Sequence, residues 1–270
     1  MDTTDSLSEE ILRNALGSAR FGKTVYYFPA IGSTNDFARE LASGGAAEGA
    51  VVVSGEQIRG RGRQGRRWIS APGAGIYLSI ILRPGLPPAN ATGITLLAAV
   101  ATARAIDTVT GLRPGIKWPN DILIGGKKIC GILTEAGSDR AGEKYLILGI
   151  GVNVNNDEFP PEIRKSASSL KMRLGRAVSR KKLIVEIIHR IEESYPDFSA
   201  RGDLSKIIVV YRRFSVTLGQ QVRVEGYRGG FQGRALDVAA DGSLLVKKEN
   251  GEVTAVRSGE ITPLIFSSKK

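Results

Sequence analysis

The apolar positions in the first four fifths of the chain follow two different periods, which predict strands and helices in mixed order. Short runs of β-branched and aromatic residues such as TVYYF predict buried strands, whereas apolar residues spaced three and four apart predict amphipathic helices. Strands are predicted over residues 24–28, 50–57, 75–82, 121–137 (a hairpin turning at Gly125-Gly126) and 144–155. Helices are predicted over residues 8–16, 34–43, 91–111, 180–195 and 204–214, and residues 156–175 are predicted to be loop.

The pattern changes near Val216. From there to Leu264 the chain holds five short strand candidates, separated by the turn signals GYRGG, ADG and ENG. Short strands at this spacing predict a small β-barrel domain. A domain boundary is therefore predicted near Phe214.

Length and composition exclude several classes of protein. The 270 residues, 42% of them hydrophobic, suffice for one large domain or a large and a small one. No apolar run approaches the ~20 residues of a membrane span, and the acidic, polar N-terminus does not resemble a secretory signal. The single cysteine, Cys130, excludes an internal disulfide, and no Cys/His cluster suggests zinc. We therefore expect a soluble, cytoplasmic protein with no membrane partner.

The charge balance admits two interpretations. Thirty-eight Lys and Arg against 27 Asp and Glu give a net charge of +11. Such an excess favours a polyanionic partner or acidic substrates, but it also keeps a surface soluble. Charge alone does not decide between them.

The segment GRGRQGRRW, Gly60–Trp68, carries the strongest signal for chemistry. With Arg59 it places five arginines and three glycines in ten residues. Glycine permits positive φ, and arginine is a permanently charged planar fork that fits carboxylates and phosphates. This combination predicts a flexible loop that closes over a small anion, although a solvated basic loop has the same composition.

The same segment contains Gly60-x-Gly62-x-x-Gly65, the spacing of a dinucleotide fingerprint. That fingerprint requires a preceding strand, a following helix and an acidic residue about 20 positions later. Here WISAPGAG follows the loop and no acid lies near position 80, so a Rossmann-type site is rejected. No GxxxxGK[ST] motif is present, which excludes a P-loop.

Lysine, arginine, asparagine and backbone groups remain as candidates for chemistry. His189, the only histidine, lies beside the apolar face of a predicted helix, so Ser-His-Asp and Cys-His mechanisms are excluded. Cys130 lies in the apolar run ICGIL and is expected to be buried and inert. Lys117 in KWPND is the best single candidate, although Pro-Asn-Asp also forms turns by itself. Asn153 and Asn155 end a predicted strand, where they could face a ligand or hydrogen-bond locally.

This inventory suits the activation of a carboxylate by ATP. The carboxylate attacks the α-phosphate, and the acyl-adenylate passes to an external amine, so both nucleophiles come from substrates. The protein then has to position the reactants and neutralise phosphate charge. Arginines on a closing loop and one fixed lysine are adequate for that task.

Five motifs together carry a family resemblance. They are STN at 33–35, EQ followed by GRGRQGRRW at 56–68, KWPNDI at 117–122, KKICGILTE at 127–135 and GIGVNVN at 149–155. In this order and spacing they resemble the biotin protein ligases, and the likeness runs from about residue 24 to residue 264. The combination of GRGR-x-GR-x-W with KWPND is highly specific.

The resemblance implies an α/β (α+β) fold, with a central mixed β-sheet flanked by helices in residues 1–214 and a small SH3-like β-barrel in residues 215–270. Residues 1–22 would form a short helical extension. It also implies that biotin and ATP are substrates, that Mg²⁺ acts with ATP, and that biotin passes to one lysine of the biotin carboxyl carrier domain of acetyl-CoA carboxylase. No metal site is predicted from protein motifs.

Site residues follow from the resemblance, motif by motif. Lys117 and Arg63 are implied as catalytic residues. The residues implied to contact biotin or its adenylate are Ser33, Thr34, Asn35, Gln57, Gly60, Arg61, Gly62, Arg63, Lys117 and Gly131. Those implied to lie nearer ATP are Arg66, Trp68, Asn120 and Asn153.

Two departures from the family pattern affect these expectations. Some members carry an N-terminal winged helix that binds DNA, but only residues 1–23 precede the first predicted strand. We therefore expect the monofunctional type, with no specific DNA partner. Arg59 stands where a small residue is common, and it either adds a phosphate or surface contact or has no role. A homodimer is compatible with the resemblance.

Two other functions compete with biotin ligation. A lipoate ligase shares the fold and the adenylation chemistry, although KWPND and GRGRQGRRW fit biotin better. A basic nucleic-acid-binding module would use the arginine loop on phosphates and needs aromatic residues among the basic ones. Only Trp68 adjoins the arginines, which weakens that alternative.

Overall fold

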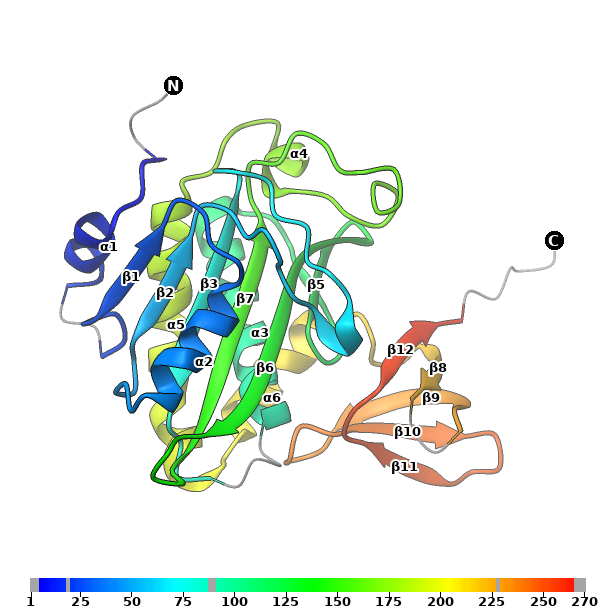
Figure 1. Ribbon diagram of the computed structural model, residues 1–270. Coiled ribbons are helices and arrows are strands. Elements are labelled where there is room, and N and C mark those ends of the chain that lie inside the picture. The colour runs from blue at the N-terminus through cyan, green and yellow to red at the C-terminus, as the bar shows by residue number, and fades with distance from the viewer. Residues whose placement is uncertain (1–4, 18–19, 87–90, 227–228, 265–270) are drawn as a thin grey trace.

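The chain folds into a large α/β body followed by a small all-β body (Figure 1). The computed structural model describes residues 5–17, 20–86, 91–226 and 229–264. The helices are α1 (Glu9–Leu16), α2 (Thr34–Ser43), α3 (Ala91–Thr110), α4 (Leu170–Leu174), α5 (Arg180–Arg201) and α6 (Ser205–Phe214), with a 3-10 turn at Arg63–Gly65. The strands of the large body are β1 (Val25–Phe28), β2 (Val51–Ser54), β3 (Gly75–Leu82), β4 (Gly115–Lys117), β5 (Asp121–Ile124), β6 (Lys127–Ser138) and β7 (Lys144–Asn153).

The seven strands form one mixed sheet in the order β1-β2-β3-β7-β6-β5-β4. β1 and β2 run parallel, and the other neighbouring pairs are antiparallel. A parallel pair needs a crossover that returns the chain to the same end of the sheet, and α2 supplies it. The predicted mixed sheet flanked by helices is confirmed.

Helices cover both faces of this sheet. α3 and α5 pack on one face, and α2 lies on the other, in front of the sheet in Figure 1. α3 is long and apolar enough to cross a membrane by length and composition, which corrects the expectation that no run comes close. However, 72% of its most apolar window is buried inside the protein, so its apolar character fits the core of this fold.

Two elements differ from the sequence prediction. α5 continues through Pro196 to Arg201, although proline usually ends a helix. Tyr195 and Phe198 are both fully buried, and the packing of these rings outweighs the lost backbone hydrogen bond. The predicted loop 156–175 contains the short helix α4, whose first turn is capped by Ser169.

The small body is a five-stranded antiparallel sheet in the order β11-β10-β9-β8-β12. Its strands are β8 (Gln221–Glu225), β9 (Phe231–Val238), β10 (Leu244–Lys248), β11 (Val253–Val256) and β12 (Glu260–Pro263). The five predicted strands are confirmed, while residues 227–228 of the GYRGG turn lie outside the described residues. The SH3-like barrel and the boundary near Phe214 stay predictions.

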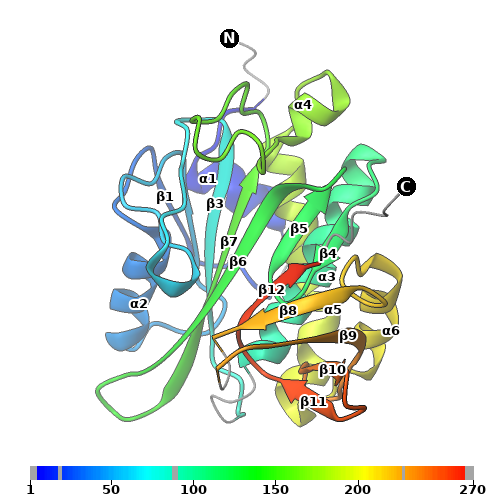
Figure 2. The same cartoon turned by 90° about the vertical axis from the view of Figure 1, so that its right-hand side faces the viewer.

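Trp118 joins the two bodies. Its backbone N donates to Thr217 Oγ1 at 2.9 Å, and its indole Nε1 donates to the Gly242 carbonyl at 3.1 Å. The side chain is only 1% exposed. Figure 2 shows β8 and β12 beside the β4–β5 end of the large sheet, so the small body meets the large one next to KWPND.

Candidate active site

A cleft lies where the arginine loop, the start of α2, strands β6 and β7 and the small body meet. It holds about 980 Å³ of empty space, a volume that includes its open mouth. The large body lines it with Ser33, Thr34, Asn35, Gln57, Arg61, Gly62, Arg63, Gln64, Arg66, Arg67, Trp68, Leu78, Lys117, Trp118, Pro119, Asn120, Asp121, Lys128, Gly131, Ile132, Leu133, Gly149, Ile150 and Gly151. The small body adds Gly259, Glu260 and Ile261.

The floor of the cleft is a network of buried polar side chains. Thr34 donates from its backbone N and its Oγ1 to Gln57 Oε1, at 2.8 and 3.0 Å. Ser79 Oγ lies 2.8 Å from Thr34 Oγ1 and 2.6 Å from Asn35 Oδ1. All four side chains are nearly or wholly buried. Buried polar groups are costly unless they are hydrogen-bonded, so this network fixes orientations that can recognise a polar ligand.

Glycines of β6 and β7 let side chains lie directly on the sheet. A Cβ on Gly149 would stand 2.1 Å from Asn35 Oδ1, and a Cβ on Gly151 would stand 2.6 Å from Trp68 Cε2. Gly131 is equally constrained, because its Cβ would stand 2.9 Å from Trp68 Cζ3. The two glycines under the indole therefore form a shelf for Trp68. Within the described residues, the buried Nε1 of Trp68 has no hydrogen-bond partner.

The arginine loop is a narrow hairpin over the cleft. Its arms pair at Arg61 and Arg67, and the Gly62 N donates to the Arg66 carbonyl at 2.7 Å. The tip residue Gln64 adopts φ 56°, in the left-handed region. The hairpin therefore has defined backbone contacts of its own as well as side-chain contacts at both ends.

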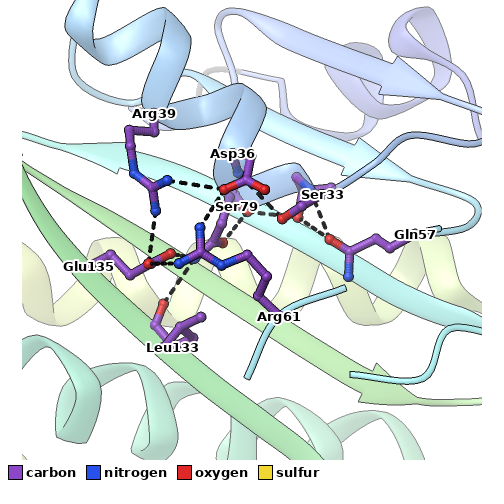
Figure 3. Close-up of polar contacts among 10 residues, drawn as sticks. Ser33, Asp36, Arg39, Gln57, Arg61, Ser79, Leu133 and Glu135 are labelled. Atoms are coloured by element: carbon purple, nitrogen blue, oxygen red, sulfur yellow. Dashed lines mark hydrogen bonds and ion pairs between the residues drawn. The ribbon is translucent and has the colours of Figure 1, made fainter. Parts of the chain in front are cut away.

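The first arm of the hairpin is attached to α2 and β6. Arg61 contacts Asp36 Oδ1 through Nη1 and donates to Glu135 Oε1 at 2.6 Å through Nη2. Figure 3 shows Arg39, from α2, converging on the same two carboxylates, at 3.0 and 2.8 Å. Partial burial lowers the pKa of Arg61, but its bonds and charge contacts with Asp36 and Glu135 outweigh that effect and raise it.

Two arginines of the hairpin, Arg63 and Arg66, reach the small body. Arg66 forms an ion pair with Glu260, which raises the pKa of Arg66 and lowers that of Glu260. Arg63 donates to Asn120 Oδ1 at 2.9 Å and to the Gly259 carbonyl at 3.1 Å. Burial lowers the pKa of the Arg63 guanidinium, and no carboxylate forms an ion pair with it in the part of the chain that the structure describes.

Lys117 lies at the end of β4, opposite Asp121 of β5, and lines the cleft. Across the described ranges, no hydrogen bond or ion pair engages its ammonium, whereas Lys128 pairs with Asp121 at 2.7 Å. Asn120 is fixed by reciprocal bonds with Ile132, each 3.0 Å long. The turn KWPND thus presents one unpaired lysine beside a rigid amide.

Most residues predicted from the sequence meet in this cleft. Three do not line it: Gly60 packs against the Trp68 carbonyl, the buried Asn153 donates from Nδ2 to the Ser168 carbonyl at 3.1 Å, and Asn155 donates from Nδ2 to the Val178 carbonyl at 2.9 Å. Sequence reasoning missed Asp36, Glu135 and Glu260. The two-residue period of β6 could have placed Glu135 on the same face as Gly131, but nothing local points to Glu260.

Neither Cys130 nor His189 lines the cleft. Cys130 is fully buried, and burial raises the pKa of its thiol well above the usual range, as expected of an inert cysteine. His189 is half-buried on α5, far along the chain from every lining residue. Among the described residues there is no group of three His, Cys, Asp or Glu side chains that could hold a metal ion.

Comparisons with known proteins found matches over both bodies of the chain. Residues 27–155 match the Biotin/lipoate A/B protein ligase family, and residues 217–262 match the Biotin protein ligase C terminal domain. The chain is 39% identical to the Bifunctional ligase/repressor BirA of Bacillus spizizenii, over 91% of this chain and 76% of that protein. It is 32% identical to the Biotin--[acetyl-CoA-carboxylase] ligase of Mycobacterium tuberculosis, over 96% of both chains.

A solved structure extends the likeness to three dimensions. The biotin protein ligase from Aquifex aeolicus in complex with biotin and ATP superposes with a TM-score of 0.77 at 28% identity. The superposition covers 89% of this chain and 98% of that one.

Proposed function

Because the chain belongs to the biotin protein ligase family, we propose that it activates biotin with ATP to biotinyl-5′-AMP and transfers the biotinyl group to a lysine of a biotin carboxyl carrier domain. The observation that carries the proposal is the cleft itself. A buried polar floor suited to the head of a small ligand leads to a mouth that holds Lys117 and Arg63, two cations without carboxylate partners among the described residues.

The chemistry needs no protein nucleophile. A biotin carboxylate oxygen attacks the α-phosphorus of ATP, and pyrophosphate leaves. The carrier amine then attacks the acyl carbon, and AMP leaves. Lys117 and Arg63 stabilise negative charge on the carboxylate and the phosphates, because they are cations held in place before the reaction.

The residues divide by their place in the cleft. We assign the floor residues Ser33, Thr34, Asn35 and Gln57, together with Arg61, Gly62 and Gly131, to biotin. Arg66, Trp68 and Asn120 are assigned to ATP. Gly60 and Asn153 would act without touching the ligand: Gly60 would shape the loop, and Asn153 would hold the end of β7.

Mg²⁺ fits this cleft as an ion that arrives with ATP. Magnesium binds through one or two carboxylates together with substrate phosphates. Asp121 and Glu260 line the cleft and supply two carboxylates, although each pairs with a cation here. The ion would neutralise phosphate charge.

For partners, we propose an acetyl-CoA carboxylase carrier domain, no specific DNA, and a cytoplasmic location. α1 buries Leu12 and Leu16 in the core against β1 and α5, so its apolar face is already used for packing. A homodimer remains part of the proposal.

The deciding experiment offers the protein ATP with biotin or lipoate, and follows the acyl-adenylate and the labelled carrier by mass spectrometry. Biotinyl-AMP and a biotinylated carrier are expected. Adenylation of lipoate in preference to biotin would assign the other branch of the same fold. Binding of nucleic acid at physiological salt without adenylation would reject the proposal.

A further inference from the structure

Glu135 stands between the arginine loop and the floor of the cleft. One of its oxygens, Oε1, accepts hydrogen bonds from Arg61 at 2.6 Å and Arg39 at 2.8 Å, while Oε2 accepts from Asn35 Nδ2 at 2.8 Å. Its side chain is 18% exposed, less than that of Arg61 at 39%. A single carboxylate therefore holds one group of the loop and one group of the floor (Figure 3).

The contacts on either side of Glu135 form one continuous chain. From Arg61 the hydrogen bonds run through Glu135 to Asn35, whose Oδ1 lies 2.6 Å from Ser79 Oγ. Ser79 Oγ contacts Thr34 Oγ1, which donates to Gln57 Oε1. Linked hydrogen bonds strengthen one another and respond together when one is lost.

The charges of the cluster balance. Asp36 and Glu135 face Arg39 and Arg61, so two carboxylates meet two guanidiniums. Arg39 belongs to the regular helix α2, whereas Arg61 belongs to a glycine-rich hairpin. The two carboxylates thus pair with one cation of a helix and one cation of the loop.

We propose that Glu135 is a positioning residue that couples the arginine loop to the floor of the biotin site. When the loop lies over the cleft, Arg61 pairs with Asp36 and Glu135, and Glu135 also orients the Asn35 amide. The orientation of the floor side chains then depends on the position of the loop. This inference rests on the proposed function only for the identity of the floor's ligand.

The test compares Glu135→Gln with Arg61→Gln, the double variant and two controls. The glutamine keeps the shape but cannot accept from three donors, because one of its oxygens becomes an NH₂ group. Arg39→Gln is the matched control, since Arg39 pairs with the same carboxylates but does not belong to the loop. Glu40→Gln, an exposed carboxylate of the same helix, controls for charge alone.

Two readouts are expected to move together. Glu135→Gln and Arg61→Gln should each raise the biotin KM for adenylation roughly 3–10-fold with a smaller change in kcat, the scale of a partly exposed charge pair. The double variant should be no worse than the more affected single variant, because both remove the same link. Trypsin should cut the loop after Arg63 and Arg66 faster in the Glu135→Gln protein, while Arg39→Gln and Glu40→Gln leave that rate near the wild-type value.

Multiplying effects in the double variant, or equal loop cleavage in Arg39→Gln and Glu135→Gln, would overturn the coupling. If Glu135→Gln lowers the melting temperature, the contrast of Arg61→Gln with Arg39→Gln decides, because Arg61 is an exposed loop side chain. Unchanged loop cleavage and biotin KM in Arg61→Gln would then reject the proposal. The cleavage readout needs no substrate, so a protein that fails to adenylate biotin rejects the proposed function and leaves this test in force.

Discussion

Arg61 and Arg66, on the two arms of the arginine hairpin, form ion pairs with different parts of the molecule. Arg61, in the first arm, is neutralised by carboxylates of the large body, and Arg66 is neutralised by Glu260 of the small one. Arg63 lies between them and, among the described residues, bonds only to neutral amide and carbonyl oxygens. The contrast shows that a row of arginines is not a row of equal phosphate ligands, because the charge left for substrate depends on each partner.

Loss of an unpaired cation should have the largest effect. Lys117→Ala is expected to lower biotinyl-adenylate formation by about 10²–10³-fold, the scale of one preorganised donor, with the fold intact. Lys128→Ala removes a lysine of the same cleft that is already paired with Asp121, and should cost less than about tenfold. Single-turnover adenylation and circular dichroism on both variants measure this. Similar losses in the two would contradict the distinction between paired and unpaired cations.

The same distinction separates two arginines of the loop. Arg63→Gln should lower adenylation roughly 10–100-fold and release the adenylate early, because its charge is not already balanced by a carboxylate. Arg66→Gln should cost less than about fivefold, since its charge is shared with Glu260 and its side chain is 61% exposed. Adenylation rates and biotinylation of bystander lysines would be compared in parallel. A larger loss from Arg66→Gln would reverse the assignment.

A substitution at Gly149 can perturb the floor of the cleft beside Asn35 without affecting the contacts of Arg63 and Arg66. Gly149→Ala places a methyl group 2.1 Å from Asn35 Oδ1 and should displace that amide, with a loss of stability of about 1–3 kcal/mol. We expect the biotin KM to rise while the ATP KM stays within about twofold, because Arg63 and Arg66 are attached elsewhere. Gly85→Ala, with open space around its Cβ, is the control for urea unfolding. Equal rises in both KM values would show that the floor and the contacts of Arg63 and Arg66 are not separate.

The smallest expected effect is that acid weakens the ion pair between Arg66 of the loop and Glu260 of the small body. The hydrogen bond from Arg66 lowers the pKa of Glu260, so Glu260 binds protons less readily in the folded protein than in the unfolded one. Its stabilising contribution is therefore complete above the ordinary glutamate pKa of about 4.3 and is lost as pH falls through the lowered value. Tryptic cleavage is impractical there, so pepsin cutting of the loop between pH 5 and 3 is the measurement. Glu260→Gln should remove the part of the pH dependence that this carboxylate supplies; an unchanged profile would assign it to other groups.

Much of the fold could be predicted from the sequence because it depends on local periodicity. The buried strand GIYLSIIL, the two glycines of the β5–β6 turn and the five short strands after Phe214 are each visible within a few residues. Where prediction failed, distant contacts had outweighed local preference. α5 passes through Pro196, where Tyr195 packs against Phe21 and Phe198 lies against Gly93 of α3.

The site divides in the same way. The sequence by itself determined which residues carry charge, which glycines permit close approach, and that Lys117 and the arginine loop belong to one chemistry, because side-chain type and spacing are local properties. Only the tertiary structure decided which of those charges stay free. Ion pairing depends on atoms within about 4 Å, and Arg61 and Glu135, or Arg66 and Glu260, come that close only after the chain has folded.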